Sequence, residues 1–497
     1  MSLHKHIFKV GAWTGVSRLL GFVRDLFIAA VLGAGVLSDI FFAAFKLPNI
    51  FRDWLGEGAL NVAFVPMFSG YKSRPNIASY FASNTFSWLM LVLLGVTIIA
   101  TIFMPLILMG GLPGFSAVPG KMELTVIIAR ILFFYIFLVC GVGFLSAILN
   151  AFSEFAYAAM MPALLNAFMI GGLVAAVHFG IADERALYIL SAAVLIAGLA
   201  QVAILLWRLR ARKFGLRIIR PRVNQRMKTL FKRIGIGFVG TGFYQINIIM
   251  GALIASLQSG AISYLYYADR MVQLPFAMVG LAAGTVLLTS LSDAIKVKNL
   301  AKVHRQQNAV LSGTLIWIFP SMVGLFALAV PIMQFVFERG AWTHDATLAT
   351  AAVIMILCIG LPAMSIGQIY QKTLYAAQDM KTPVKMSIIS LVVSGALFIA
   401  LFPWIGFLSV PVGTVVGGYL RDALLIIACR RKGLFKVSAQ TLRKCAMFLG
   451  LSFAMGVGLW AVRDAGLITG LFSLGAVIAL AAALYMPIAL LVNKKLK

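Results

Sequence analysis

The segment from Ile7 to Leu32 reads IFKVGAWTGVSRLLGFVRDLFIAAVL and decides the fold class. It is longer than the roughly 20 residues that an α-helix needs to cross a hydrocarbon core about 30 Å thick. Arg18, Arg24 and Asp25 interrupt this apolar run. A cleavable signal peptide has a short, uncharged apolar core, so we expect the segment to be retained as a membrane-spanning helix.

The rest of the chain repeats this pattern. Apolar residues make up 62% of the 497 residues and charged residues make up 11%. In soluble domains, roughly 45–50% of the residues are apolar and about 25% are charged. A transmembrane β-barrel would show shorter segments of alternating polarity. The pattern therefore predicts an all-α polytopic membrane protein of about fourteen transmembrane helices. The predicted spans are 7–32, 36–66, 82–109, 124–149, 157–177, 186–207, 234–257, 262–291, 309–335, 347–374, 384–402, 406–428, 445–462 and 467–492.

The net charge of +27 is distributed unevenly between the loops. Alternate loops hold most of the Lys and Arg residues, and the loop 208–233 alone holds eleven of them. Because basic loops stay on the cytoplasmic side, both termini are predicted to be cytoplasmic. Basic residues beside membrane-spanning helices are attracted to anionic lipid headgroups. This attraction explains the positive charge, so no nucleic-acid partner is expected. The basic segments are 5–9, 72–74, 208–233, 296–305, 381–385, 430–444 and 494–497.

Two pairs of segments indicate an internal repeat. Residues 35–43, GVLSDIFFA, align with residues 260–268, GAISYLYYA, and residues 149–151 align with 374–376 at the same offset. Such a repeat predicts two pseudo-symmetric six-helix lobes related by an axis along the membrane normal, with a substrate site between them. The predicted organisation is an N-terminal lobe at 1–207, a basic cytoplasmic linker at 208–233, a C-terminal lobe at 234–430, and two extra helices with a basic tail at 431–497.

Ionisable residues inside the predicted spans are the candidate functional residues. Charge at membrane depth is costly and usually faces a bundle interior or a water-filled cavity. Three predicted helices hold most of it, in a set that comprises Arg18, Arg24, Asp25, Asp39, Lys46, Arg52, Asp53, Glu57, Asp269 and Arg270. At 1.5 Å per residue, Arg24 and Asp39 should lie roughly 5–10 Å from the outer ends of their helices, and Arg18 about 20 Å deep.

The arginines in this set indicate an anionic substrate that carries a phosphate or a diphosphate. The planar guanidinium of arginine stays ionised and donates paired hydrogen bonds to such groups. Asp39, Lys46 and Asp53 are spaced by seven and should form one stripe on a helix, which Glu57 extends by one turn. The alternative is structural: Arg18–Asp25, Lys46–Asp53 and Asp269 with an arginine would be ion pairs, and residues near helix ends would extend to the interface.

Other chemistry has little support in the sequence. The four cysteines show no CxxC spacing and the five histidines fall in loops, so neither a metal site nor a catalytic site is predicted. No Walker A motif is present, so direct use of ATP is not expected. No cofactor is predicted, and the energy for transport would come from the membrane potential or from an unidentified coupled ion. Glu154 and Asp379 are expected to cap loops between helices. Arg421 and Asp422 lie inside a span without an assigned role.

Four segments resemble the MurJ family of bacterial lipid II flippases, which belongs with the MATE-type exporters in one superfamily. The resemblance covers nearly the full length and is most specific in the first, second and eighth predicted helices. The segments are SRLLGFVRD at 17–25, the stretch 33–66 that begins GAGVLSDIFFAAFKLPN, YYADR at 266–270 and DMKTPVK at 379–385.

The resemblance implies export of lipid II, the undecaprenyl-diphosphate-linked peptidoglycan precursor, across the bacterial cytoplasmic membrane by alternating access. It also implies substrate-binding roles for Arg18, Arg24, Arg52 and Arg270, a supporting acid at Asp39, and a lipid-tail groove in the last two helices. Membrane lipids and cell-wall synthesis proteins are the expected partners. The alternatives are a transporter of another polyprenyl-linked glycan or of a cationic drug, a membrane enzyme acting on polyprenyl diphosphates, and a scaffold.

Overall fold

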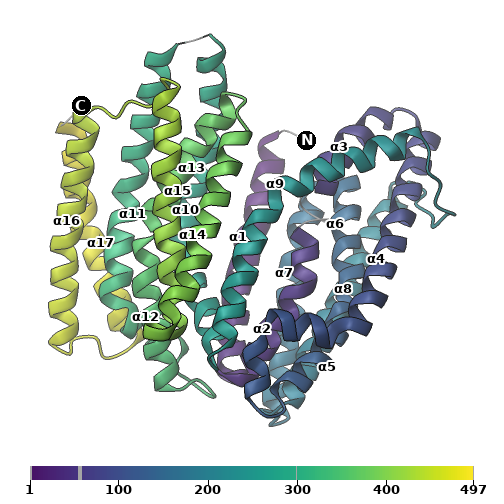
Figure 1. Ribbon diagram of the computed structural model, residues 1–497, viewed down its shortest axis with the longest axis horizontal. Coiled ribbons are helices and arrows are strands. Elements are labelled where there is room, and N and C mark those ends of the chain that lie inside the picture. Colours follow the sequence, from purple (N-terminus) through teal and green to yellow (C-terminus); the bar gives the residue numbers. More distant parts are fainter. Residues whose placement is uncertain (1–2, 54–58, 298, 496–497) are drawn as a thin grey trace. The chain divides into compact units, whose positions relative to one another are not determined.

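The computed structural model describes residues 3–53, 59–297 and 299–495. Within these ranges every regular element is a helix, which confirms the predicted all-α class (Figure 1). By length and apolarity, nine helical stretches of the described residues could each cross a membrane. The chain is therefore a multi-pass membrane protein, and the number fourteen stays a prediction.

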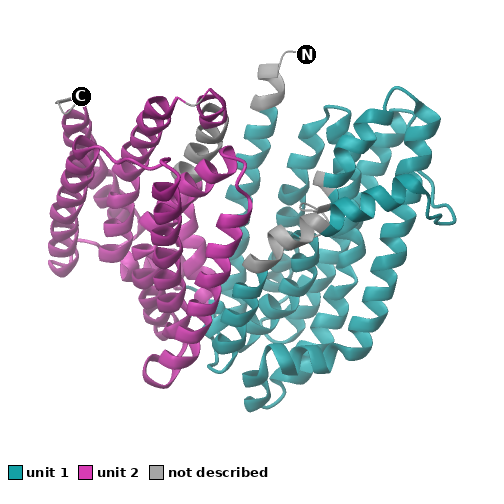
Figure 2. Cartoon of the chain, turned by 45° about the horizontal axis from the view of Figure 1, so that its top comes forward, with its two compact units in different colours: residues 1–263, 339–342 teal, residues 264–338, 343–497 magenta. Residues whose placement is uncertain are grey.

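The chain divides into two compact units (Figure 2). The first comprises residues 1–263 and 339–342, and the second comprises residues 264–338 and 343–497. Helices α1 to α9 belong to the first unit; their bounds are α1 (Leu3–Leu32), α2 (Val36–Phe51), α3 (Ala59–Tyr71), α4 (Pro75–Gly111), α5 (Lys121–Phe133), α6 (Tyr135–Ala151), α7 (Phe155–His178), α8 (Arg185–Ala211) and α9 (Gln225–Ser256), with the 3-10 helix η2 (Pro113–Ala117).

The second unit contains all but the first residues of α10 and the helices that follow it. Their bounds are α10 (Ala261–Lys296), α11 (Leu300–Phe337), α12 (His344–Ile359), α13 (Leu361–Ala376), α14 (Lys381–Ile405), the 3-10 helix η3 (Gly406–Leu408), α15 (Ser409–Arg431), α16 (Ala439–Asp464) and α17 (Leu471–Lys495). The predicted division into lobes and linker is not tested by these units and stays a prediction.

Three predicted spans are each described as two helices. The span 36–66 corresponds to α2 and α3, 124–149 to α5 and α6, and 347–374 to α12 and α13. Phe134 separates α5 from α6 and Gly360 separates α12 from α13. Side-chain caps begin several of the other helices: Asn224, Asn299 and Ser438 each accept a hydrogen bond from a backbone N–H three residues later.

Glycines allow close helix contacts in both units. A Cβ on Gly198 of α8 would lie 2.8 Å from the Leu138 side chain of α6, and one on Gly413 of α15 would lie 2.7 Å from Phe398 of α14. Helices in lipid gain little from burying apolar surface against one another, so they associate through close packing at such positions.

The helix ends that the repeat aligns have the same backbone geometry. After α6, the Glu154 N–H donates to the Leu149 carbonyl at 2.9 Å, and after α13 the Asp379 N–H donates to the Leu374 carbonyl at 2.9 Å. The residue before each acid has a positive φ, 63° at Ser153 and 61° at Gln378. This is the Schellman termination of a helix, and its occurrence at both aligned positions supports the repeat.

Both acids also form ion pairs. Glu154 binds Arg208 at 2.6 Å and also Arg212, and the hydrogen bond from Arg208 lowers the pKa of Glu154. Asp379 binds Lys432 at 2.8 Å. Burial alone would raise the pKa of Asp379, but hydrogen bonds from Lys432 and Thr382 lower it to about 2. Only Asp379 caps the following helix, by accepting from the Thr382 N–H.

A close backbone crossing ties the end of α1 to the loop 339–342 in the first unit. The Ala341 N–H donates to the Ala30 carbonyl at 2.8 Å. Gly33 and Gly340 flank this bond with φ values of +67° and +62°, and a Cβ on Gly340 would overlap the Ala30 carbonyl oxygen. Both glycines are therefore required by conformation and by space.

Replacing Gly340 with Ala should lower the thermal stability of the purified protein, because the added methyl group cannot fit against Ala30. Gly180→Ala is the matched control, since Gly180 has a φ of +66° but no heavy atom within 4 Å of the point that a Cβ would occupy. We expect Gly180→Ala to lower the free energy of unfolding by about 1 kcal/mol, because of the strained φ alone. Gly340→Ala should lower it by a clearly larger amount. Equal shifts in melting temperature would contradict the crossing.

Candidate functional site

Arg24 is a buried cation whose side chain is fixed on two sides. Its Nε and Nη2 atoms donate to Asp25 Oδ1 at 3.0 and 2.6 Å, and Nη1 donates to Asn166 Oδ1 of α7 at 2.9 Å. Asn166 in turn donates to the Ser17 carbonyl at 3.0 Å. The structural alternative named Arg18 as the partner of Asp25, but the arginine that binds Asp25 is the neighbouring Arg24.

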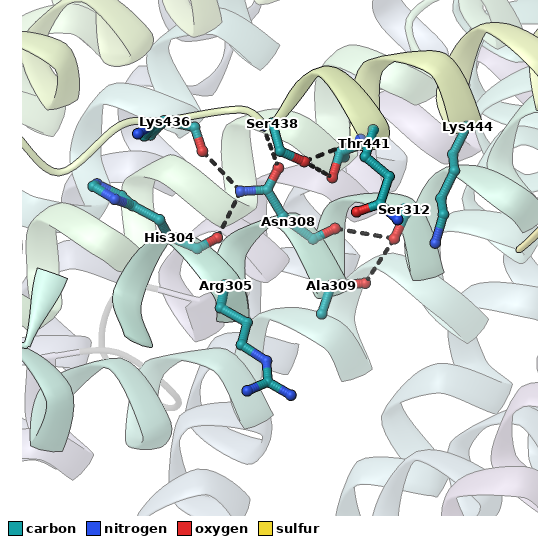
Figure 3. Close-up of a pocket in the computed structure, with 10 residues that line it drawn as sticks. His304, Arg305, Asn308, Ala309, Ser312, Lys436, Ser438, Thr441 and Lys444 are labelled. Carbon is teal, nitrogen blue, oxygen red and sulfur yellow. Dashed lines mark hydrogen bonds between the residues drawn. The ribbon is translucent and has the colours of Figure 1, made fainter. Parts of the chain in front are cut away.

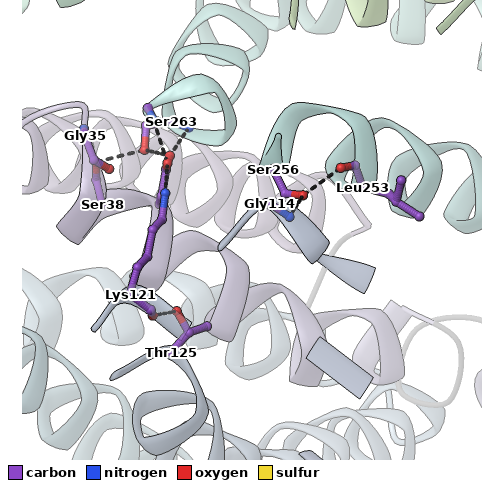
Figure 4. A network of polar contacts seen from close by, with 10 residues as sticks. Gly35, Ser38, Gly114, Lys121, Thr125, Leu253, Ser256 and Ser263 are labelled. Carbon is purple, nitrogen blue, oxygen red and sulfur yellow. Dashed lines mark hydrogen bonds and ion pairs between the residues drawn. The ribbon is translucent and has the colours of Figure 1, made fainter. Parts of the chain in front are cut away.

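Asp39 is fully buried near the start of α2 and is the centre of a polar network. Lys121 Nζ donates to Asp39 Oδ2 at 2.8 Å, and the Gly260 N–H donates to the same oxygen at 2.7 Å. Ser263 donates to Oδ1 from its N–H at 2.9 Å and from its hydroxyl at 2.7 Å. Figure 4 shows Lys121 and Ser263 converging on this point.

The donors to Asp39 explain why a carboxylate is tolerated there. Gly260 directly precedes α10 and Ser263 lies in its first turn, and the unpaired N–H groups and dipole of a helix start favour a negative charge. Ser38 Oγ also lies 2.8 Å from Ser263 Oγ, so two residues that the repeat aligns hydrogen-bond to each other. The charged partner of Asp39 is Lys121.

Lys121 is a functional candidate that the sequence analysis missed. Its side chain is 1% exposed, and its ammonium also lies 4.0 Å from the centroid of the Phe115 ring. It lies just before the predicted span 124–149 and so falls outside the set of charged residues within the predicted spans. A signal was nevertheless present, since Lys121 and Asp39 are opposite charges near the predicted outer ends of two spans.

Arg52 and Asp53 follow α2 directly and are about one-third exposed. Arg52 Nη2 donates to Asp53 Oδ1 at 3.1 Å, and Gln245 of α9 donates to Asp53 Oδ2 at 3.0 Å. The Lys46–Asp53 pair, named as the structural alternative, is therefore replaced by Arg52–Asp53. Lys46 is exposed, and Glu57 lies outside the described residues.

Asp269 and Arg270 lie side by side on α10 in the second unit, and both are exposed. Arg270 Nη2 donates to the Tyr266 hydroxyl at 3.3 Å, with the guanidinium 5.0 Å from the centroid of that ring. Gln273 donates to Asp269. Arg18 on α1 is exposed as well. Exposed charge inside an apolar helix is tolerated where the side chain meets water.

The site residues therefore fall into two groups. Arg24, Asp25 and Asp39 are buried and hydrogen-bonded, whereas Arg18, Lys46 and Arg270 present charge at the surface of their helices. The buried group can order helix ends and orient a guanidinium. The exposed group can bind an anion, since each cation offers donors to a phosphate oxygen.

Arg421 and Asp422 form a local ion pair on α15. Arg421 Nη2 donates to Asp422 Oδ1 at 3.0 Å, and Asp422 is 3% exposed. A Cβ on Gly367 of α13 would lie 2.6 Å from Arg421 Nη2. The pair thus packs directly on the α13 backbone, which a larger residue at 367 would prevent.

Comparison with known proteins gives the family. The family model described as lipid II flippase MurJ matches residues 28–480. The chain is 35% identical over 92% of its length to a probable lipid II flippase MurJ of Rhizobium tropici, covering 86% of that protein. A probable lipid II flippase MurJ of Vibrio cholerae is 30% identical, over 98% of this chain and 96% of its own.

The chain belongs to the MurJ family.

Solved structures support the same fold. A lipid II flippase MurJ in an inward closed conformation matches with a TM-score of 0.83 at 24% identity, over 98% of this chain and 99% of its own. A MATE family multidrug transporter in an inward-facing conformation matches with a TM-score of 0.70 at 12% identity, over 84% of this chain and 94% of its own. Membership of MurJ makes the chain a membrane transporter of the bacterial inner membrane and not an enzyme.

Replacing Lys121 with Met should destabilise the purified protein by about 3–5 kcal/mol, because it leaves a buried carboxylate without its cation. Glu123→Gln is the matched control: it removes an exposed charge from the same helix turn and should change stability by no more than about 0.5 kcal/mol. Adding Asp39→Asn to Lys121→Met should recover part of the loss. Additive losses in the double variant would show that the two charges do not depend on each other.

Proposed function

We propose that this chain moves lipid II from the inner to the outer leaflet of the bacterial cytoplasmic membrane. Membership of the MurJ family over residues 28–480 carries the proposal. The charges agree with it: the substrate would bring a diphosphate into the membrane, and the exposed basic residues Arg18, Lys46 and Arg270 sit on helices expected to cross it.

Each arginine has a distinct part in this proposal. Arg24 is oriented by Asp25 and Asn166. Its guanidinium is therefore already positioned before an anion binds, and little further conformational entropy is lost on binding. Arg270 donates to the Tyr266 hydroxyl, and in this proposal its guanidinium binds a phosphate oxygen of the substrate. Arg18 and Arg52 would guide the diphosphate along its route, and the supporting acids limit repulsion between these cations in the empty state.

Alternating access requires that contacts at one end of the transporter form and break. In this proposal the Asp39 network is one such contact, because Lys121 and the first turn of α10 hold α2 in the present state. A charged network suits a reversible closure, since water can solvate the carboxylate and the ammonium once they separate.

Directed transport needs a source of energy, which we propose is the membrane potential or a coupled ion. Moving one charge across 100 mV is worth about 2.3 kcal/mol. We also propose that both termini are cytoplasmic, as the basic loops favour. Proteins that make or consume lipid II are the proposed functional partners, together with the membrane lipids around the chain.

The proposal is tested by measuring lipid II on the outer face of cells depleted of this protein, in a strain without a second flippase. A membrane-impermeant enzyme that cleaves lipid II provides the measurement. Wild type should restore cleavage, and Arg270→Ala should reduce it at least about tenfold, because it removes a charged contact to the diphosphate. Arg185→Ala, which changes a highly exposed arginine at the first residue of α8, is the matched control and should restore cleavage fully.

Unchanged outer-face lipid II after depletion would mean that the chain transports another molecule, such as a different polyprenyl-linked glycan. Full activity of a well-expressed Arg270→Ala protein would leave the function in place but remove Arg270 from the binding site.

A further inference from the structure

A second basic site lies within the second unit. A pocket of about 340 Å³ opens between the first turns of α11, the segment that leads into α16, and the first turns of α16. Figure 3 shows side chains from all three segments around it. The predicted flippase residues Asp269 and Arg270 do not line it.

Asn308 holds the walls of this pocket together. Its Nδ2 atom donates to the His304 carbonyl at 2.6 Å and to the Lys436 carbonyl at 2.7 Å, and its Oδ1 atom accepts from the Ser438 N–H at 3.0 Å. His304 Nε2 lies 3.0 Å from the Gly433 carbonyl oxygen. Because these bonds join α11 to the linker before α16, the pocket is a built feature and not a gap between loose segments.

The pocket is strongly basic. Arg305, Lys436 and Lys444 line it, and none of its described lining residues is acidic. Lys444 is only 9% exposed, and its ammonium donates to a neutral group, Asn493 Oδ1, at 3.0 Å. Among the described residues no carboxylate forms an ion pair with any of these three cations. A buried ammonium without a counter-charge is costly, so an anion is expected beside it.

The chain provides further attraction for an anion. The pocket includes the first turn of α16, where Ser438 caps the helix by accepting from the Thr441 N–H at 3.1 Å. The remaining N–H groups and the dipole of a helix start favour negative charge. This feature adds to the three side-chain cations and does not carry the inference alone.

The surroundings of the pocket are amphipathic. One turn further along both helices, Ile316 of α11 and Phe448 of α16 join Tyr485 and Ala489 of α17 in a buried apolar cluster. Leu442 and Met447 on the first turns of α16 are exposed large apolar residues. A ligand seated here would therefore place an anionic group among cations and an apolar portion along helices that face lipid.

We propose that this pocket binds the phosphate headgroup of an anionic glycerophospholipid from the surrounding membrane. Basic pockets between transmembrane helices at the cytoplasmic side bind such headgroups. The acyl chains would lie along the exposed apolar side chains of α16. A bound headgroup would neutralise Lys444 and join α11 to α16, so it would stabilise the packing of the last two helices.

Native mass spectrometry of the full-length protein in neutral detergent tests this proposal, with phosphatidylglycerol as the probe and phosphatidylcholine as the neutral comparison. Arg305→Gln and Lys444→Gln should each weaken phosphatidylglycerol binding about tenfold, because each removes a charged contact to the phosphate. Arg443→Gln is the matched control, since Arg443 is exposed, adjacent in sequence and outside the pocket. It should change the affinity less than about twofold.

Each other outcome overturns the proposal in a distinct way. Equal weakening by Arg443→Gln would show unspecific attraction to a basic surface. Displacement of phosphatidylglycerol by millimolar inorganic phosphate would show a free-anion site, and tighter retention of undecaprenyl diphosphate than of phosphatidylglycerol would show a substrate site. Arg305 is exposed, so Arg305→Gln keeps the test valid even if Lys444→Gln fails to fold.

Discussion

Asp39 has no exposed surface, and an ammonium, two backbone N–H groups and a hydroxyl all donate to its carboxylate. A buried carboxylate without such partners would protonate or destabilise the fold. This one interaction joins α2 to the start of α5 and to the start of α10 within the first unit. The start of α2, the helix that carries Lys46, is therefore held by the buried acid.

The helical class could be predicted because long apolar runs leave little choice in lipid, where the backbone must satisfy its own hydrogen bonds. The breaks at Phe134 and Gly360 could not, since neither residue excludes a helix. That the charged residues lie inside membrane spans stays a prediction, and their pairing could not be predicted from the sequence. Sequence spacing favours partners three or four residues apart, whereas Arg24 and Arg52 fold back onto the next residue, and Asp39 and Asp53 are completed by Lys121 and Gln245 from distant helices.

The repeat shows how duplicated helices can differ in chemistry. The aligned ends of α6 and α13 keep one backbone geometry and an acid that binds a basic residue. At the start of α2 and α10, the aligned serines are retained and contact each other, but Asp39 aligns with Tyr264. Backbone geometry is set by local helix termination, so it persists, while side chains at the same positions can take on a new function.

If the chain forms a path for an anionic headgroup, the exposed charged positions of α1, α2 and α10 meet water and not lipid. Reactivity of single cysteines toward a water-soluble thiol reagent tests it directly, in a chain whose four native cysteines are replaced. Arg18→Cys, Lys46→Cys and Arg270→Cys should react quickly. Ile102→Cys and Leu484→Cys, at positions that are each 62% exposed on apolar helices, should react slowly. Slow reaction at the charged positions as well would contradict a water-filled path and return those residues to a structural role.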